Sequence, residues 1–535
     1  MQPFYPFRLG LSPFADSLSE RILHRFKNQG WEGLVDRVVA LSRKSESSRD
    51  DVDSGQFLEN LREAMLAGRM LPNSPLLVNC AERNPSLFAC FAIDVEKPVQ
   101  EFLPTFRMIH DSMGGVGYAV NGCEPSLTEF IRLIDSDTVA HQVGRPRPAS
   151  NAVTMPIGGD LDSFLSLAGQ LKTTNMNVAL DDEFMRSVLH EDSAQARLRS
   201  IAHSIHSKGQ PGIIFPDRIT QVARQNESKF AANVCGEAPL AVDESALLAS
   251  INVSAFCQPA AEGRVDFDEK GFCELVRLCV RFLDGMHDLQ SHATEEIRAN
   301  TLATRKVGVG IMGFSHALIL LGYRYGSEES IVFARRLSGL LYQSASEESM
   351  RLAERFGAYP AYLPEHGTLK RNANLAAIAG TATIALIVGT SCGIEPIFSH
   401  LWTQKVIDRE IQFLDPVVKH VLTLHGINPE NVRQRLLQGE ALASIAGEEL
   451  AYLMPIAVEV SGIDHILVQS ALQSHIDCGI TKTINCGSDT LVEEIQEWIV
   501  RAHDLGCVGL TIYRDQSLAD QPIRNNVKND TVCNI

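Results

Sequence analysis

The sequence has 535 residues, 45% hydrophobic and 21% charged, which is the balance of a globular protein with a large core. Its formal net charge of −17, from 48 basic and 65 acidic residues, argues against nucleic acid or an anionic membrane as a partner, because both require a basic face. A few local donors can still hold a small anion such as a phosphate. The start lacks the apolar core of a secretory signal and the 12 cysteines include no CxxC pair, so we expect reduced thiols in a cytoplasmic protein.

The predicted elements divide the chain into three regions. Residues 1–70 are predicted to be helical, for example at 17–27, where apolar residues recur on one helix face. From residue 71 to 515, short apolar runs alternate with amphipathic helices, which indicates an α/β catalytic domain. We expect residues 516–535 to form a polar, flexible tail.

A glycine pattern lies at the centre of the α/β region. Residues 306–314 are predicted to form a buried strand, and a helix follows. Gly308, Gly310 and Gly313 match the GxGxxG pattern of dinucleotide-binding loops, so an NAD-dependent oxidoreductase is one alternative. The acidic residue that such a site needs about 20 positions later falls in the turn-like segment YGSEES. We therefore interpret the glycines as close packing between strand and helix.

Two later segments complete the pattern. Residues 372–394 carry no charge, but glycine, threonine and serine interrupt the apolar runs, so we predict buried strand and loop there and no membrane span. Residues 490–506 are predicted to form an amphipathic helix that ends at a glycine, and residues 507–513 a strand.

Histidines do not form a metal site in the sequence pattern. His203 and His206 have HxxH spacing, and His287 and His292 lie near two aspartates. No cysteine pair, HExxH motif or facial triad completes a ligand set, so we predict no directly ligated metal.

The segment FAANVCGEAPL, residues 230–240, is the strongest candidate for chemistry. It places Asn233, Cys235 and Glu237 at alternate positions, so an extended segment would present all three side chains on one face. A thiol can act as a nucleophile or carry a radical, a carboxylate can act as a general base, and an amide can hold a substrate. Taken alone, the spacing also fits a surface turn.

The same segment resembles the finger loop of ribonucleotide reductases. The ending TKTIN…GLTIYRD resembles the cobalamin-dependent class of that family, and the paired tyrosines of the iron-dependent class are not found near it. Further segments resemble the family in the same order along the chain: LPNSPLLVNC (71–80), SLFACFAI (86–93), TTNMNVALDDEFM (173–185), GQPGIIFPDRI (209–219), RKVGVGIMGFSHAL (305–318), GTATIALIVGTSCGIEPIF (380–398) and the ending itself (481–515).

The resemblance implies a ten-stranded α/β barrel with Cys235 at the tip of a loop inside it, and adenosylcobalamin as the cofactor. Cys235 would become a thiyl radical and take the hydrogen from the 3′ carbon of a ribonucleotide. Glu237 would accept the 3′-hydroxyl proton, and Asn233 would hydrogen-bond the sugar. Cys90 would protonate the leaving 2′-hydroxyl and supply reducing equivalents. The product would be a 2′-deoxyribonucleotide, a DNA precursor.

Substrate-binding residues follow from the same resemblance. Ser74 belongs to the substrate-facing entry segment, and Gly380, Thr381, Ala382 and Thr383 match the phosphate-binding loop, where backbone donors at a helix start face the anion. The implied partners are a ribonucleoside di- or triphosphate and a thiol or other small reductant, and the implied state is a monomer or homodimer.

The pattern of the family is broken at several positions. The second redox cysteine falls at Ala246, which cannot form a disulfide with Cys90, and the usual cysteine pair of the tail is reduced to Cys533. Lys97 stands where the family has an effector-binding aspartate, and Gly380 stands where it favours proline.

These departures leave several interpretations open. The enzyme would use another electron donor such as formate, or a surrogate thiol among Cys392, Cys257 and Cys533. Alternatively, the chain is a divergent radical enzyme with another nucleotide substrate, or a catalytically silent partner that binds nucleotide. The intact trio of Asn233, Cys235 and Glu237 argues against a silent partner.

Overall fold

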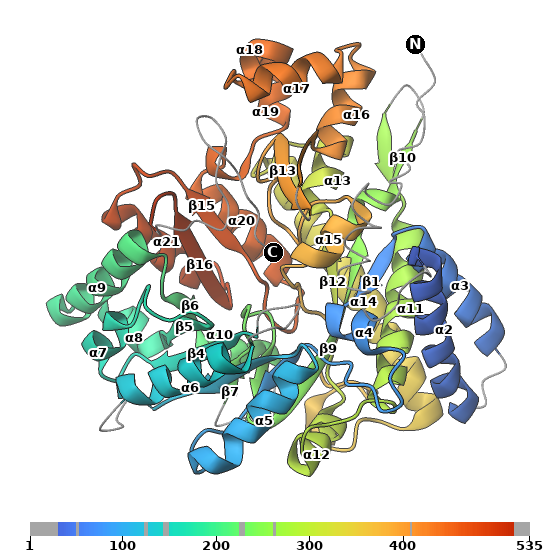
Figure 1. The fold of residues 1–535 in the computed structure, drawn as a ribbon, viewed down its shortest axis with the longest axis vertical. Helices are drawn as coiled ribbons and strands as arrows, with labels where there is room; N and C mark the ends of the chain where they lie inside the picture. The colour runs from blue at the N-terminus through green and yellow to red at the C-terminus, as the bar shows by residue number, and fades with distance from the viewer. Residues whose placement is uncertain are drawn as a thin grey trace.

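The structure is a computed structural model that describes residues 30–49, 53–121, 127–142, 149–223, 230–260, 264–406 and 409–517. The predicted helix at 17–27 and residues 518–535 of the expected tail lie outside the described residues. The first described elements are helices α2 (Gly30–Arg49) and α3 (Ser54–Leu66), the short strand β1 (Met70–Pro72) and helix α4 (Ser74–Asn79). Figure 1 shows α2 and α3 side by side at one edge of the molecule.

One half of the central sheet consists of parallel strands joined by helices. Its strands, in spatial order, are β2 (Cys90–Ala92), β3 (Gly115–Ala119), β4 (Asn151–Pro156), β5 (Thr174–Ala179) and β6 (Gly212–Ile214). The helices of this half are α5 (Val99–Asp111), α6 (Leu127–His141), α7 (Leu161–Ser166), α8 (Asp182–Ser187), α9 (Asp192–Lys208) and, after β6, α10 (Pro216–Ala223).

The other half is also parallel within itself and runs antiparallel to the first. It contains β9 (Glu244–Asn252), β12 (Val307–Met312), β15 (Thr483–Cys486) and β16 (Gly509–Arg514). Its helices are α11 (Glu269–His287), α12 (Glu295–Thr304), α13 (Phe314–Leu321), α14 (Glu328–Phe356), α15 (Ala382–Val388), α20 (Gly462–Gln473) and α21 (Val492–Asp504). Strand β9 pairs antiparallel with β2, and β16 pairs antiparallel with β6.

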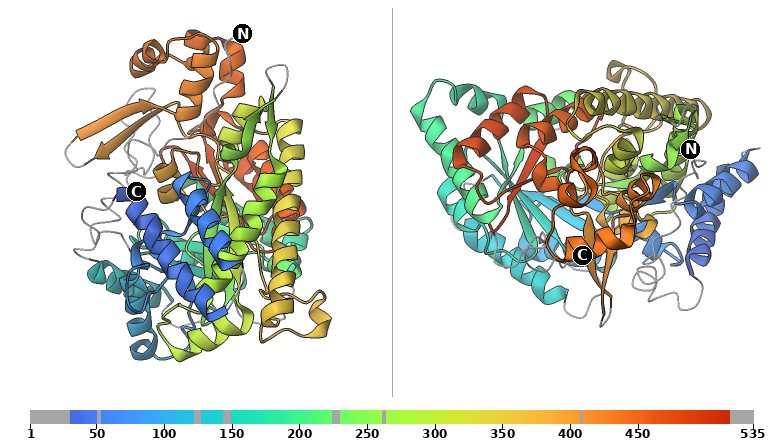
Figure 2. Two further views of the ribbon diagram at one scale, coloured as in Figure 1. Left: turned by 90° about the vertical axis from the view of Figure 1, so that its right-hand side faces the viewer. Right: turned by 90° about the horizontal axis from the view of Figure 1, so that it is seen from above.

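Two extended segments close the ring. Residues 374–378 bridge to β12 through Val309 and Ala376, and residue Ile378 bridges in parallel to Ile480, just before β15. The ten-stranded sheet therefore curves round on itself, and helices lie around its outer side (Figures 1 and 2). The predicted ten-stranded α/β barrel is confirmed.

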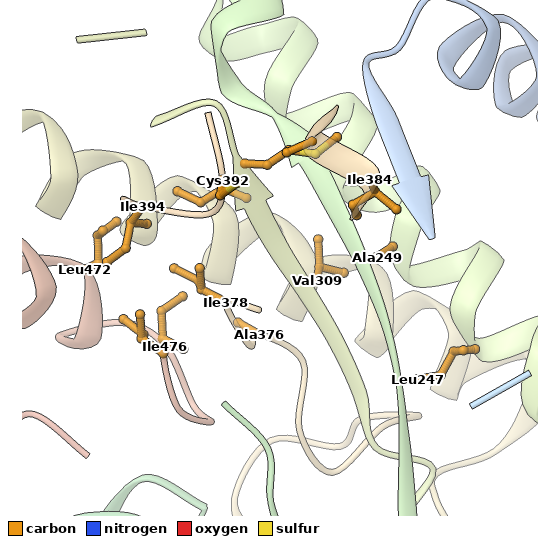
Figure 3. Close-up of a cluster of buried hydrophobic side chains, with 14 of the residues drawn as sticks. Leu247, Ala249, Val309, Ala376, Ile378, Ile384, Cys392, Ile394, Leu472 and Ile476 are labelled. Carbon is orange, nitrogen blue, oxygen red and sulfur yellow. The ribbon is translucent and has the colours of Figure 1, made fainter. Parts of the chain in front are cut away.

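Strand alternation separates the inside of the barrel from its outer core. Side chains of β9, β12 and residues 374–378 point outward at alternate positions into a large hydrophobic core. Figure 3 shows Val309 and Ile378 of this core together with Ile384 of α15 and Leu472 of α20. The residues between them point inward, and many of these are small.

Small inward residues explain the glycine pattern at 308–313. A Cβ on Gly310 would lie 2.3 Å from the Ala377 carbonyl oxygen, and one on Gly308 would lie 2.3 Å from a Leu248 methyl carbon. The predicted strand and helix are confirmed as β12 and α13. The close contacts of Gly308 and Gly310, however, are with β9 and with residues 374–378, and not with the following helix as the sequence suggested.

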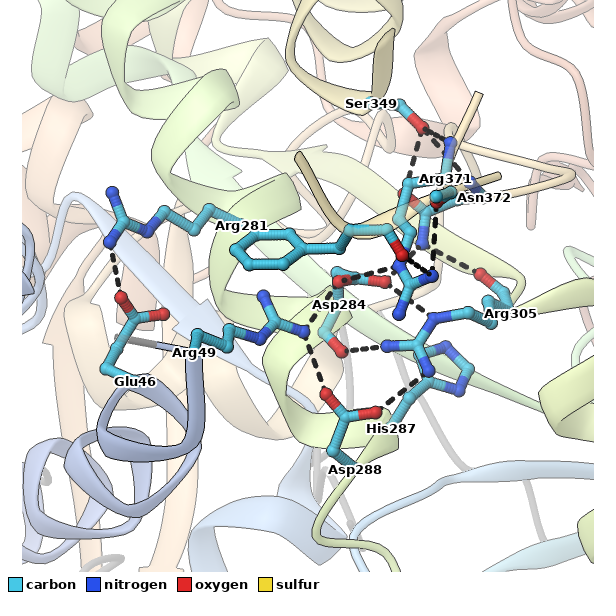
Figure 4. Close-up of polar contacts among 12 residues, drawn as sticks. Glu46, Arg49, Arg281, Asp284, His287, Asp288, Arg305, Ser349, Arg371 and Asn372 are labelled. Atoms are coloured by element: carbon cyan, nitrogen blue, oxygen red, sulfur yellow. Dashed lines mark hydrogen bonds and ion pairs between the residues drawn. The ribbon is translucent and has the colours of Figure 1, made fainter. Parts of the chain in front are cut away.

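A buried ion-pair network attaches α2 to the barrel (Figure 4). Asp284 of α11 accepts hydrogen bonds from Arg49 Nη2 at 2.6 Å and Arg305 Nε at 2.9 Å, and Asp288 pairs with the same two arginines. Burial by itself would raise the pKa of the Asp284 carboxyl, but Arg305, Arg49 and Arg371 outweigh it and hold that pKa well below its usual range. The network is thus charged on both sides.

A separate subdomain is formed by residues 401–459, which lie between β12 and β15 in the sequence. The hairpin of β13 (Leu401–Val406) and β14 (Arg409–Leu414) is followed by α16 (Pro416–Leu424), α17 (Pro429–Leu437), α18 (Leu442–Ala446) and α19 (Glu448–Leu453). This subdomain has its own hydrophobic core and stands above the barrel in Figure 1.

The uncharged stretch at 372–394 differs in part from its prediction. Residues 374–378 are extended, as expected, but residues 382–388 form helix α15, which ends at Gly389 with a φ of +71°. In the described ranges, no helix is long and apolar enough to cross a membrane.

Candidate active site

A hairpin lies inside the barrel and carries the predicted trio. It consists of β7 (Phe230–Ala232), β8 (Pro239–Ala241) and the turn between them. A Cβ on Gly117 of β3 would lie 2.0 Å from the Ala232 carbonyl oxygen, so only glycine lets β7 approach this strand. Ala232 also packs with Ile214 of β6, and Leu240 packs in one cluster with Ala246 of β9. Contact with strands of both halves places the hairpin inside the ring.

The trio does not lie on an extended strand, so the expectation of a shared strand face is wrong. Gly236 has a φ of +81°, and its N–H donates to the Asn233 carbonyl at 3.1 Å, which makes a turn. Asn233 and Glu237 are buried, whereas Cys235 is exposed at the tip. The turn nevertheless brings the Asn233 and Glu237 side chains together at Cys90.

Cys90 sits between the amide and the carboxylate. Asn233 Nδ2 donates to Cys90 Sγ at 3.0 Å, and the Cys90 thiol donates to Glu237 Oε1 at 3.8 Å. The orientation of the amide is set by the Ala238 N–H, which donates to Asn233 Oδ1 at 3.0 Å. All three predicted partners of Cys235 therefore meet in one polar cluster.

The electrostatics of the cluster favour a protonated thiol beside a weakly acidic carboxyl. Burial raises the pKa of the Cys90 thiol well above its usual value, and the nearby Glu237 charge raises it further. Burial also raises the pKa of the Glu237 carboxyl, partly offset by hydrogen bonds from its own loop, Thr481 and Asn233. The raised pKa values keep the proton on the Cys90 thiol and make the Glu237 carboxylate a stronger base than an exposed glutamate.

Thr481 is a site residue that the sequence analysis did not single out. Its Oγ1 lies 2.8 Å from Glu237 Oε2 and 3.0 Å from the Cys235 carbonyl oxygen. The Gly479 N–H donates to the Glu237 carbonyl at 2.8 Å, so the segment that closes the ring also holds the hairpin turn. The TKTIN motif was a usable signal, but only the fold shows that its first threonine reaches the carboxylate.

The predicted phosphate loop lies next to Thr481. A Cβ on Gly380 would be 3.3 Å from Thr481 Cγ2. Thr381 has a left-handed φ of +54°, unusual for a β-branched residue, and its Oγ1 accepts the Gly393 N–H at 2.7 Å. Helix α15 begins at Ala382, as the resemblance implied, so the N–H groups of its first turn point out of the helix start.

Comparison with known proteins identifies the family. Residues 190–371 and 363–513 match the family model of the ribonucleotide reductase barrel domain. The chain belongs to the ribonucleotide reductase family.

Individual relatives cover most of the reductase. It is 30% identical over 526 residues to a vitamin B12-dependent ribonucleoside-diphosphate reductase of Mycobacterium tuberculosis, covering 90% of this chain and 75% of the relative. It is 29% identical over 557 residues to a protein of the same name from Thermoplasma acidophilum, covering 95% and 71%. The fold resembles that of the Actinobacillus ureae class Id ribonucleotide reductase alpha subunit, with a TM-score of 0.79, 17% identity and coverage of 95% and 98%.

The reductase lacks a second thiol opposite Cys90. Cys90 and Ala246 are direct partners in the antiparallel pairing of β2 with β9, and both belong to the alanine-rich inner cluster. Cys478, just before Gly479, packs at the edge of the same cluster and was not considered from the sequence.

The surrogate thiols suggested by the sequence lie elsewhere. Cys392 is buried in the outer core, where Figure 3 shows it close to Ile394. Cys257 packs against that outer core, and its thiol donates to the Ala317 carbonyl at 3.8 Å. Cys533 lies outside the described residues.

Two further predicted positions are placed by the structure. Ser74 begins helix α4 and is half-buried, and the N–H of the preceding Asn73 donates to the Leu248 carbonyl on β9. Lys97 forms ion pairs with Asp243 at 2.9 Å and Glu296 at 3.2 Å, so its charge is compensated within the chain.

His287 is buried in the core beside the ion-pair network of Asp284 and Arg305. His287 hydrogen-bonds to the Lys306 carbonyl at 3.0 Å, and burial lowers its pKa to about 3. Over the ranges that the structure describes, no group of three or more histidine, cysteine, aspartate or glutamate side chains is arranged to hold a metal ion.

Proposed function

We propose that this reductase converts ribonucleotides to 2′-deoxyribonucleotides by radical chemistry that starts at the Cys235 thiol and uses adenosylcobalamin as the cofactor. One observation carries the proposal: Cys90, Asn233 and Glu237 form a hydrogen-bonded cluster inside the barrel, below an exposed cysteine at the tip of the same loop. The names of the Mycobacterium and Thermoplasma relatives support the reaction and the cofactor.

The surroundings of Cys235 fit the cofactor. Cys235 is exposed, unlike Cys90, so the tip of the loop is accessible to a bound group. Adenosylcobalamin, when bound, supplies the radical that removes the hydrogen atom from this thiol. Cys235 is exposed at the loop tip, so the bound substrate and cofactor would exclude water from the radical.

The geometry of the cluster suits two neighbouring hydroxyl groups of one ribose. Cys90 Sγ and Glu237 Oε1 are only 3.8 Å apart, so a proton donor and a proton acceptor are close enough to act on vicinal oxygens. In the proposed reaction Cys235 takes the hydrogen from the 3′ carbon while Glu237 accepts the 3′-hydroxyl proton. Cys90 then protonates the leaving 2′-hydroxyl, and Asn233 holds the sugar.

The phosphate end of the substrate is assigned to residues 380–383. The loop precedes α15, adjoins Thr481 and has a strained backbone at Thr381. Backbone N–H groups at the start of a helix favour an anion. Thr481 lies between this loop and the Glu237 carboxylate, which would contact the ribose.

The source of the reducing electrons follows from Ala246. Reduction of one 2′-hydroxyl to hydrogen consumes two electrons, and a Cys90–Ala246 pair cannot supply them as a disulfide. We infer an external donor, either a small thiol or formate. A radical enzyme with a different nucleotide product is the second candidate, favoured by the same alanine.

The test compares the wild-type chain with Cys235→Ser under anaerobic conditions. Each is incubated with adenosylcobalamin, the four ribonucleoside di- or triphosphates, and dithiothreitol or formate. We expect deoxynucleotide and hydrogen exchange with the cofactor only in the wild type, and unchanged activity in the control Cys273→Ser, on outer helix α11. Deoxynucleotide formation by Cys235→Ser would overturn the proposal. Cofactor cleavage in mixtures that all lack deoxynucleotide would favour the second candidate. The absence of both cofactor cleavage and deoxynucleotide would favour a silent partner.

A further inference from the structure

A buried ion pair adjoins both parts of the proposed active site. Lys482 Nζ donates hydrogen bonds to Glu395 Oε2 and, at 2.6 Å, to the Thr483 carbonyl. The Thr483 N–H, at the start of β15, donates to Glu395 Oε1 at 2.7 Å. The Lys482 side chain is fully buried, and that of Glu395 is 7% exposed. We call Glu395 and Lys482 the buried pair.

One member of the buried pair adjoins the proposed general base. Lys482 directly follows Thr481, whose Oγ1 lies 2.8 Å from Glu237 Oε2. Thr483, the next residue, is held by the buried pair through both its N–H and its carbonyl. The buried pair therefore fixes the backbone that follows the threonine in contact with Glu237.

The other member adjoins the loop at residues 380–383. Glu395 ends a tight turn, in which its N–H donates to the Cys392 carbonyl at 2.9 Å. Within this turn the Gly393 N–H donates to Thr381 Oγ1 at 2.7 Å. A Cβ on Gly393 would lie 2.9 Å from the Ala379 carbonyl oxygen, so the turn packs tightly against the start of the loop. The position of Glu395 and the position of the loop are therefore coupled.

Stability alone is a poor reason for two charges at this place. Burial lowers the pKa of the Lys482 ammonium, and the Glu395 carboxylate opposes that effect. Removing two charges from water costs free energy that their attraction often does no more than offset, so an apolar pair of similar volume can be at least as stable. What the ion pair adds is a directional link between two segments that are 87 residues apart in the chain.

We propose that Glu395 and Lys482 are positioning residues that fix the distance between the loop at residues 380–383 and the Glu237 carboxylate. This inference rests on the proposed function, which places the phosphates of the substrate at the loop and its ribose at Glu237. A nucleotide that contacts both parts binds and reacts well only when their separation matches its own length. A ligand that contacts the loop alone does not depend on that separation.

The test compares two probes by isothermal titration calorimetry without cobalamin: a ribonucleoside diphosphate, which spans both parts, and inorganic pyrophosphate, which reaches the loop alone. The double variant Glu395→Leu/Lys482→Met removes both charges at similar volume, so no buried charge is left unpaired. We expect its affinity for the ribonucleoside diphosphate to fall by about tenfold, while that for pyrophosphate stays within about twofold of the wild type. Glu395→Gln, which keeps an acceptor for the Thr483 N–H, should show a smaller change of the same sign.

The control is Glu46→Gln, which breaks the buried ion pair with Arg281 between helices α2 and α11. It should lower the urea midpoint and leave the ratio of the two dissociation constants unchanged. The inference is overturned if that ratio is also unchanged in the folded double variant, or if the double variant loses both probes equally. Failure of pyrophosphate to bind the wild type at millimolar concentration would overturn the assignment of the loop and this inference with it. A wild type that shows the expected ratios and forms no deoxynucleotide would contradict the proposed reaction alone.

Discussion

Cys90 and Ala246 are direct cross-strand partners on the antiparallel strands β2 and β9, and both side chains belong to the inner cluster of the barrel. Directly paired antiparallel residues have Cα atoms about 4.5–5.5 Å apart, within the range that a disulfide spans. A single substitution can therefore supply the thiol that this position lacks.

We expect Ala246→Cys to form a disulfide with Cys90. Mild oxidation should remove two titratable thiols per chain relative to the reduced variant, and turnover with a dithiol reductant should rise. Ala249→Cys is the matched control, because Ala249 lies on the same strand but belongs to the outer core. Equal thiol counts before and after oxidation of Ala246→Cys would contradict the register of β2 and β9.

Thr481→Val should shift the pH dependence of turnover. The hydroxyl stabilises the ionised Glu237 carboxylate, so its loss raises the pKa of that carboxyl further. A general base must be deprotonated, and activity falls as the pH falls through its pKa. The acidic limb of the kcat profile should therefore move to higher pH by about one unit. Thr481→Ser should restore the wild-type profile; a profile that does not move in the valine variant would exclude this role.

Gly117→Ala should displace the hairpin that carries the trio. The added Cβ would lie 2.0 Å from the Ala232 carbonyl oxygen, so backbone has to move. We expect turnover to fall by at least about tenfold, since a displacement of 1 Å near reacting groups costs up to about a hundredfold. Gly158→Ala is the control, because a Cβ there meets nothing within 4 Å. Similar kcat values in the two variants would argue against a fixed hairpin.

Asp284→Asn should destabilise the fold without touching the active site. It leaves the buried Arg49 and Arg305 without their shared carboxylate, which costs about 3–5 kcal/mol in the free energy of unfolding measured with urea. Because the folded-state pKa of Asp284 is lowered, its contribution is fully present above about pH 4 and is lost as the pH falls further. The variant should therefore lose less stability than the wild type on acidification below pH 4. If the Asp284→Asn variant had the same urea midpoint as the wild type at neutral pH, the stabilising role of this network would be refuted.

The sequence was informative where local patterns decide structure. Periodicity predicted the strand and helix now seen as β12 and α13, and the helix and strand near the C-terminal end correspond to α21 and β16 with shifts of one or two residues at their limits. It failed at residues 382–388, where a short apolar run fits a buried strand and a buried helix equally well. It also failed at residues 233–237, because an alternating pattern cannot distinguish a strand from a turn when a glycine permits the turn.

By itself, the sequence determined which chemical groups are present: the thiols of Cys90 and Cys235, the Glu237 carboxylate, and an alanine in place of a second redox thiol. Only the tertiary structure decided their arrangement. It placed Ala246 opposite Cys90, Thr481 against Glu237, and Lys482 against Glu395. These residues are far apart in the chain, and their contacts depend on strand register and ring closure, which are set by packing of the whole barrel and leave no local signature in the sequence.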